Sequence, residues 1–163
     1  MIKICKVRDV KTPSRANSTD AGLDFFVPEY SQKFVDDLWE KNPGLYITKE
    51  GIYLPQLNRV LIPSGIKSWF PDGYALVGFD KSGIASKQGL TLLAKVCDSS
   101  YMGEIHINLV NVSKTEQIIR FGQKITQFLL LPIDCSIPIE ISIEEYENRE
   151  TARGSGGFGS TGI

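Results

Sequence analysis

Several residue types and patterns that often mark a function are scarce in this chain of 163 residues. Cysteine occurs three times, as Cys5, Cys97 and Cys135, and no two of these lie at CxxC spacing. An odd number without that spacing argues against a disulfide framework or a cysteine zinc site, and favours a reducing, cytoplasmic compartment. His106 is the single histidine, which excludes a histidine-rich metal centre.

Excess charge and long apolar runs are also missing. The formal net charge is −1, so no bulk field attracts the protein to nucleic acid or to an anionic membrane. No stretch approaches the ~20 apolar residues of a membrane helix. The N-terminal stretch MIKICKVRDV alternates charged and apolar side chains, unlike the unbroken apolar core of a signal peptide. We therefore expect no membrane partner and no direct contact with nucleic acid.

The chain is rich in short apolar runs separated by turn residues. Such runs occupy residues 58–70, 73–80, 89–97, 103–112 and 116–133. They recur at intervals of roughly 8–15 residues, which is typical of an all-β barrel or sandwich. Within residues 104–110, polar and apolar side chains alternate, which predicts a strand with one wet face and an exposed His106 on it.

One segment has helical spacing instead. In SQKFVDDLWEKNPG (31–44), Phe34 and Leu38 lie one turn apart, Ser31 is a suitable N-cap, and a Pro-Gly pair ends the pattern. We expect a short helix near 31–42, inserted at the surface of a β domain. Its acidic side chains are interpreted as a solvated face and not as a metal site.

The glycine-rich end, RGSGGFGSTG (153–162), raises a separate question about ligands. Glycine backbone can wrap phosphates with its N–H groups, Arg153 adds a planar fork for phosphate oxygens, and Phe158 offers a face for a base. The composition predicts a flexible arm at 151–163 that closes as a lid over a nucleoside triphosphate, behind a β domain at 1–150. A flexible solubilising tail is the alternative.

Two internal loops carry chemistry that suits the same ligand. In DKSGIAS (80–86), Lys81, the Ser82 hydroxyl and the open backbone of Gly83 suit a phosphate group. In CDSSYMGE (97–104), Asp98 lies between two predicted strands, where a carboxylate can take a proton from water. Each loop, taken alone, is also compatible with an ordinary turn.

A third loop contains DAGLDF (20–25). Asp24 begins another predicted strand, and a carboxylate there is suited to hold Mg²⁺ through water, because Mg²⁺ usually keeps several of its waters. The alternative is an aspartate that closes a turn.

Five blocks in order along the chain carry a family resemblance. AGLDF, KSGIA, VCDSSYMGEI, GQKITQ and RGSGGFGSTG resemble the five ordered motifs of the trimeric dUTP pyrophosphatases, the dUTPases. The resemblance extends from residue 20 to residue 162. It implies a distorted jelly-roll β-barrel, a homotrimer with active sites built from several subunits, and hydrolysis of dUTP to dUMP and pyrophosphate with Mg²⁺. That activity keeps uracil out of DNA and supplies dUMP for dTTP synthesis.

The resemblance also implies roles for individual residues. Asp98 would orient and deprotonate the attacking water at the α-phosphorus, and Tyr101 would pack under the deoxyribose and exclude a 2′-hydroxyl. Asp24 would lie in the water shell of the metal. The remaining substrate-binding residues would be Lys81, Ser82, Gly83 and Gln127 at the phosphates, Arg153 at the γ-phosphate, Phe158 over the uracil, and Gly159, Ser160 and Thr161 in the closing lid.

The chain departs from the family pattern at four positions. Lys81 and Lys124 stand where arginine is usual, so the bidentate fork is lost at both. Lys95 replaces a common glycine and Leu92 a common asparagine in the hairpin that reads the base. Base recognition is therefore expected to differ here in detail.

Two other functions remain open at this point. One is a dCTP deaminase or a bifunctional relative of the same fold, against which the full glycine-rich tail argues. The other is a regulatory binding protein that responds to dUTP, with the segment 31–44 as the docking site of a protein partner.

Overall fold

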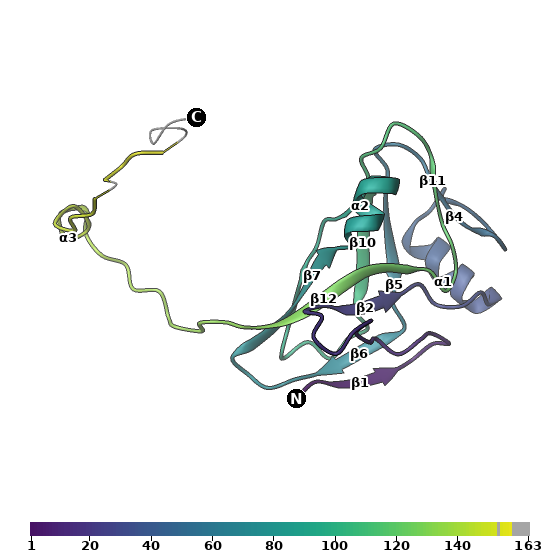
Figure 1. The fold of residues 1–163 in the computed structure, drawn as a ribbon, viewed down its shortest axis with the longest axis horizontal. Helices are drawn as coiled ribbons and strands as arrows, with labels where there is room; N and C mark the ends of the chain where they lie inside the picture. The colour runs from purple at the N-terminus through teal and green to yellow at the C-terminus, as the bar shows by residue number, and fades with distance from the viewer. Residues whose placement is uncertain (153, 158–163) are drawn as a thin grey trace.

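A computed structural model of the chain describes residues 1–152 and 154–157, and the fold is built mainly from antiparallel strands (Figure 1). The described residues form four sheets, which do not close into one barrel. Their strands, in spatial order, are β1 (Lys3–Lys6) and β6 (Ile66–Trp69); β5 (Arg59–Pro63), β10 (His106–Asn111) and β8 (Leu90–Leu92); β11 (Gln117–Ile119), β4 (Gly51–Leu54) and β3 (Tyr46–Thr48); and β2 (Leu23–Phe26), β12 (Lys124–Pro132), β7 (Tyr74–Asp80) and β9 (Val96–Asp98). This jelly-roll-like arrangement confirms the all-β prediction.

The four-stranded sheet β2-β12-β7-β9 carries three of the predicted site residues, Asp24, Gln127 and Asp98. Gln127 of β12 lies opposite Asp24 of β2 on one side and Phe79 of β7 on the other. At the far end of β7, Ala75 lies opposite Asp98 of β9. Pairing of distant segments in one sheet thus brings Asp24 next to Gln127, while Asp98 lies near the other end of β7.

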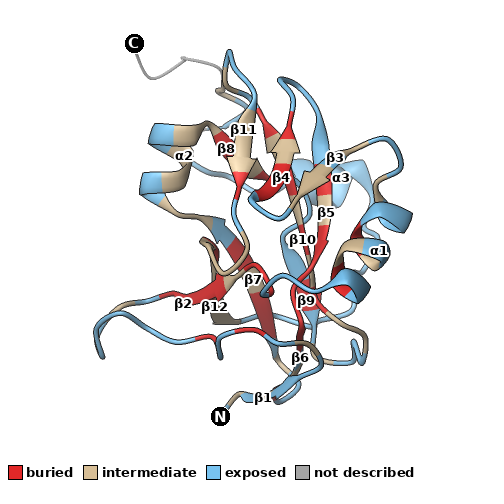
Figure 2. Cartoon of the chain, turned by 90° about the vertical axis from the view of Figure 1, so that its right-hand side faces the viewer, coloured by how far each residue is buried: buried red, intermediate tan, exposed pale blue. Residues whose placement is uncertain are grey.

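The core is formed by buried side chains of the strands and of α1. The buried stretches of the strands are red in Figure 2. On β10, Ile107 and Leu109 are buried while the intervening side chains are partly exposed, as the alternation predicted. Phe25 and Phe128 join β2 to β12, with their ring centroids 4.5 Å apart. Burial of each such side chain contributes about 1.5–3 kcal/mol.

The predicted helix is present as α1 (Gln32–Lys41). Ser31 caps it, because its hydroxyl accepts the Phe34 N–H at 3.2 Å, and Phe34 and Leu38 are buried against the body. The acidic face is only partly solvated, since Asp37 is half-buried and pairs with Arg8 at 2.7 Å. Its side chain is thus engaged in structure, contrary to the simple interpretation of a solvated face.

Beyond Pro132 the chain leaves the body and runs outward to the short helix α3 (Ile143–Glu147), as Figure 1 shows. Four large apolar side chains on this arm are strongly exposed: Ile137, Ile139, Ile143 and Tyr146. Within the described residues, no helix is long and apolar enough to cross a membrane.

Candidate active site

The first group of predicted residues meets where β2, β12 and β7 lie side by side. Asp24 is only 4% exposed, and its two carboxylate oxygens are held by the ammonium groups of Lys81 and Lys124. The contact with Lys124 measures 2.6 Å. We call these three residues the lysine–carboxylate cluster. Both lysines that replace the family's arginines thus converge on one buried carboxylate.

The charge state of Asp24 follows from two opposing effects. Burial acts to raise the pKa of this carboxyl, because it penalises the charged form. The hydrogen bonds and charges of Lys124 and Lys81 outweigh burial and hold the pKa of Asp24 below its ordinary value. The carboxylate is therefore ionised at neutral pH, with two cations beside it.

Gln127 connects this cluster to the turn after β7. Its side-chain amide donates to the carbonyl of Asp80 at 3.0 Å, and it packs so closely on Gly22 that a Cβ there would lie 2.3 Å from Oε1. The Asp80 carboxylate in turn accepts from the Thr91 hydroxyl at 2.6 Å and from the Leu92 N–H at 2.8 Å. The backbone that leads into Lys81 is thus fixed from both sides.

Ser82 and Gly83 form the first turn of α2 (Ser82–Gln88), a helix that sequence analysis did not predict. Backbone N–H groups in a first turn have no partner inside their own helix. A Cβ on Gly83 would meet nothing within 4 Å among the described residues, and its φ is not positive, so the fold itself does not require glycine there. An open backbone of this kind allows close approach of a ligand.

The second group lines a cavity of about 210 Å³ at β9 and the hairpin that follows, which we call the Asp98 pocket. Asp98 ends β9 with its side chain exposed. The Tyr101 ring lies over Gly103, where a Cβ would come within 2.3 Å of the tyrosine oxygen, and its hydroxyl donates to the Glu104 carbonyl at 3.0 Å. The lining residues are Ala94, Lys95, Val96, Cys97, Asp98, Tyr101, Ile105, His106 and Phe128.

Two polar residues of this pocket, His106 and Lys95, were not predicted from the sequence to belong to it. His106 was expected to be exposed, but it is half-buried, and its Nδ1 donates to the Glu104 carbonyl at 2.8 Å. Its Nε2 is buried and has no hydrogen-bond partner among the residues that the structure describes. Lys95, noticed only as a departure from the family pattern, lines the pocket and is exposed. Burial raises the pKa of the neighbouring Cys97 thiol.

One chain does not bring the two groups together. Asp98 pairs with Ala75, whereas Lys81 follows Asp80 at the other end of β7. Five residues along an antiparallel strand span about 17 Å. The phosphates of one triphosphate are joined through single bridging oxygens, so the groups that serve them must lie closer than this.

The predicted lid residues cannot be placed in the same way. Arg153, Phe158, Gly159, Ser160 and Thr161 lie outside the described residues. Their roles remain predictions.

Within the part of the chain that the structure describes, the side chains that could ligate a metal do not gather into a metal site. In residues 1–152 and 154–157, no group of three or more His, Cys, Asp or Glu side chains could hold a metal ion. Both oxygens of Asp24 already hold ammonium groups, which argues against direct coordination of a metal by this carboxylate.

The chain is similar in sequence to proteins of known family. A family model described as dUTPase matches residues 44–162. A deoxyuridine 5'-triphosphate nucleotidohydrolase from Wolbachia pipientis subsp. Culex pipiens is 39% identical over 118 residues, covering 69% of this chain and 74% of that protein. Another, from Hydrogenobaculum sp., is 34% identical over 157 residues, covering 95% of this chain and 92% of that protein.

Solved structures agree on the fold. A single-residue mutant of the dUTPase of Staphylococcus bacteriophage 80alpha, with dUpNHpp, has a TM-score of 0.70 at 21% identity, covering 100% of this chain and 99% of that chain. A single-residue mutant of the dUTPase from phage phi11 of S. aureus, described with a structural Mg(II) ion, has a TM-score of 0.68 at 18% identity, covering 86% of this chain and 96% of that chain. Native EIAV dUTPase reaches 0.64 at 22% identity, covering 88% and 98%.

Proposed function

The chain belongs to the dUTPase family and hydrolyses dUTP, and we propose that Asp98 is the general base of this reaction. The observation that carries the assignment is the pocket in which Asp98 and Tyr101 lie together at the end of β9. An exposed carboxylate beside a cavity of nucleoside size can hold a water molecule at a bound α-phosphate.

The reaction needs few protein groups. Asp98 takes a proton from the water, whose oxygen bonds to the α-phosphorus while the bond from that phosphorus to the leaving pyrophosphate breaks. The proton then passes to solvent. Positioned general bases contribute about 10²–10⁴-fold, and the remaining acceleration comes from positioning and charge neutralisation.

Tyr101 provides discrimination at the sugar. Its ring is fixed by the Gly103 backbone beneath it and by the hydrogen bond to Glu104. A ring held in this way packs under a deoxyribose and leaves no room for a 2′-hydroxyl. Its position in the pocket supports selection of dUTP over UTP.

We assign the phosphates to the first group of residues, which lies around the lysine–carboxylate cluster. Lys81, the backbone at Ser82 and Gly83, and Gln127 would hold them, with lysine acting as a point charge where the family commonly has an arginine fork. The glycine-rich arm would then close over the ligand. Its residues Arg153, Phe158, Gly159, Ser160 and Thr161 would grip the γ-phosphate, stack on uracil and exclude water.

A complete site then requires more than one subunit. The separation of about 17 Å along β7 supports a site shared between subunits, in which Asp98 of one subunit faces Ser82 and Gly83 of another. The family resemblance makes this assembly a homotrimer. The arm beyond Pro132 supports it as well, because its exposed isoleucines would be covered by a neighbouring subunit.

Mg²⁺ would enter on the triphosphate, where Asp24 reaches it through water. When bound, it neutralises phosphate charge and holds the phosphates in one arrangement. The reducing, cytoplasmic compartment is supported by the free thiols of Cys5, Cys97 and Cys135.

Pyrophosphate release from dUTP, dTTP, dCTP and UTP, each with Mg²⁺, tests the assignment in wild type and Asp98→Asn. We expect release from dUTP alone, and at least a roughly hundredfold lower rate in the variant. Release from several nucleotides would show that Lys95 has changed base selection. Ammonia release from dCTP would support the deaminase alternative, and an unaffected Asp98→Asn rate would remove Asp98 as the base.

A regulatory role at α1 is a second candidate, because Trp39 is exposed on this helix beside the acidic residues Asp36 and Glu40. Capture of a protein partner with and without a nonhydrolysable dUTP analogue tests it. Loss of that partner on Trp39→Ala would support the role.

A further inference from the structure

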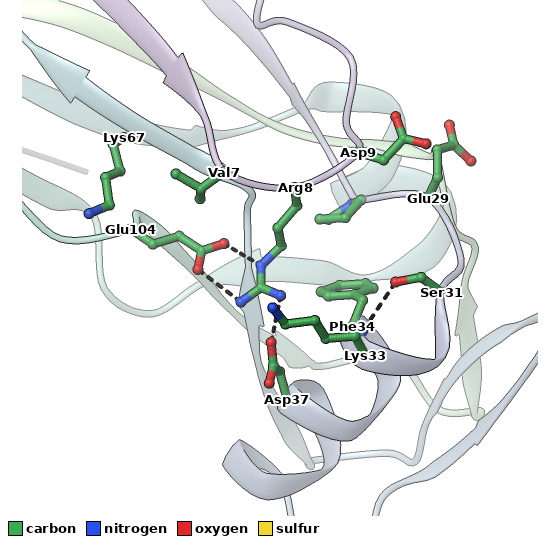
Figure 3. A pocket seen from close by; sticks show the side chains of 11 residues that line it. Val7, Arg8, Asp9, Glu29, Ser31, Lys33, Phe34, Asp37, Lys67 and Glu104 are labelled. Carbon is green, nitrogen blue, oxygen red and sulfur yellow. Dashed lines mark hydrogen bonds and ion pairs between the residues drawn. The ribbon is translucent and has the colours of Figure 1, made fainter.

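A cavity of about 510 Å³ lies between α1, the loop after β1 and the hairpin that carries Asp98. Arg8 stands at its centre (Figure 3). Two of its nitrogens donate to the Glu104 carboxylate, at 2.7 and 3.0 Å, and a third donates to Asp37 of α1 at 2.7 Å. A single guanidinium thus connects the inserted helix to the hairpin.

Glu104 is held by further bonds to neighbouring segments. Its side chain also accepts the Gly65 N–H at 2.7 Å. Its backbone carbonyl accepts the hydroxyl of Tyr101 at 3.0 Å and Nδ1–H of His106 at 2.8 Å. The residue that receives Arg8 is therefore the same residue that fixes the ring of Tyr101 in the Asp98 pocket.

We propose that Arg8 is a positioning residue that transmits the placement of helix α1 to Tyr101 through Glu104. The inference rests on the proposed function, in which Tyr101 contacts the deoxyribose. Arg8 itself does not line the Asp98 pocket, so it acts through Glu104 and not on the substrate.

The chemistry of the linkage makes it strong enough for this role. The side chains of Arg8 and Glu104 are only 16% and 14% exposed, so solvent screens them less than a surface ion pair. The contact is bidentate, which fixes the orientation of both groups as well as their distance. The Arg8 guanidinium also lies 5.5 Å from the centre of the Phe34 ring, so α1 holds it by packing and by charge.

The cavity explains why the linkage can respond to change. Arg8 lines this cavity, so the guanidinium has room to move when one of its partners is lost. If α1 moves or loses Asp37, Arg8 keeps only Glu104 as an acidic partner, and the Glu104 side chain relaxes with it. The hydrogen bond from Tyr101 to the Glu104 carbonyl then shifts, and substrate affinity changes with it.

The test compares two neighbouring aspartates of α1. Asp37→Ala removes the contact with Arg8. Asp36→Ala removes the same charge from the next position, where the carboxylate accepts from Gln32, at 2.8 Å, and from no other residue that the structure describes. We expect Asp37→Ala to raise the KM for dUTP roughly fivefold with a smaller effect on kcat, while Asp36→Ala matches wild type.

A spectroscopic measurement separates this inference from the proposed function. Fluorotyrosine incorporated into the full chain gives a ¹⁹F resonance for Tyr101, assigned by its loss in Tyr101→Phe. We expect that resonance to shift in Asp37→Ala and in Arg8→Met, and to stay in place in Asp36→Ala. The shift is measured without substrate, so it decides the linkage even if the wild type fails to hydrolyse dUTP.

Two results would overturn the proposal. One is a Tyr101 resonance that is unchanged in both Asp37→Ala and Arg8→Met, with thermal unfolding showing that both variants are folded. The other is an equal effect of Asp36→Ala and Asp37→Ala on KM. The change in KM would then come from the charge of α1 and not from the contact with Arg8.

Discussion

Asp24 shows how a sequence motif can single out a residue while saying nothing of its surroundings. The AGLDF block identified it, but nothing in the block indicates that both carboxylate oxygens hold lysine ammonium groups. Those contacts arise because β2 and β7 both pair with β12. Lys124 was visible only as a departure from the family pattern, and its partner could not be known before the sheet order.

Asp24→Asn tests the lysine–carboxylate cluster through pH. The pKa of Asp24 in the folded protein lies below the ordinary value of 3.8, so its stabilising contribution is complete above that value and is lost as the pH falls through the folded pKa. Removing one member of a buried ion cluster costs roughly 3 kcal/mol. We expect wild type to exceed the variant by about that much at pH 7, in urea unfolding at fixed protein concentration.

The gap should close when the pH falls well below 3.8, because protonated aspartate and asparagine are then alike in charge. Asp36→Asn serves as the control for general charge effects, since Asp36 is exposed on α1. A gap that persists unchanged at acid pH would show that the two lysines do not stabilise the Asp24 carboxylate.

Single elements were predicted unevenly, for physical reasons. α1 could be predicted because Phe34 and Leu38 lie one turn apart and Ser31 caps the helix, all within one short segment. α2 could not, because serine and glycine in its first turn have low helix propensity and only context makes them helical. A helix such as α1 can therefore be predicted where its own short sequence shows which side chains will be buried.

Leu38→Ala tests the packing of α1. Leu38 is fully buried, and deletion of a buried leucine side chain costs about 2–5 kcal/mol. We expect a loss of this size in urea unfolding, while Trp39→Ala, on the exposed side of the same helix, changes stability by less than about 0.5 kcal/mol. Equal effects of the two substitutions would mean that α1 does not pack on the body as described.

For the whole molecule, motif order along the chain says nothing of which motifs meet in space. The second and third motifs are separated by only a short stretch of sequence, yet their key residues lie at opposite ends of β7. The homotrimer was implied by the family resemblance alone, because no residue pattern in the sequence predicts a subunit interface. The structure adds a physical reason for assembly, because within a single chain the two groups of predicted site residues lie far from each other.

The arm provides the last prediction. Ile137 and Ile139 are 87% and 84% exposed in the single chain, so serine at both positions removes no burial from an isolated subunit. If a neighbouring subunit covers them, the same change loses apolar contact in the assembly, and we expect Ile137→Ser/Ile139→Ser to dissociate at higher protein concentration than wild type. Sedimentation over a dilution series measures this, with dUTP hydrolysis followed in the same samples.

Glu140→Ser is the matched control, because it changes a charged residue beside Ile139 on the same arm. Mass and activity should fall together in the isoleucine variant, because the proposed site draws Asp98 and Ser82 from different subunits. Neither should change in the control. Activity that survives in a sedimenting monomer would contradict the composite site directly. In that case the roughly 17 Å between the ends of β7 would have to be bridged within one chain.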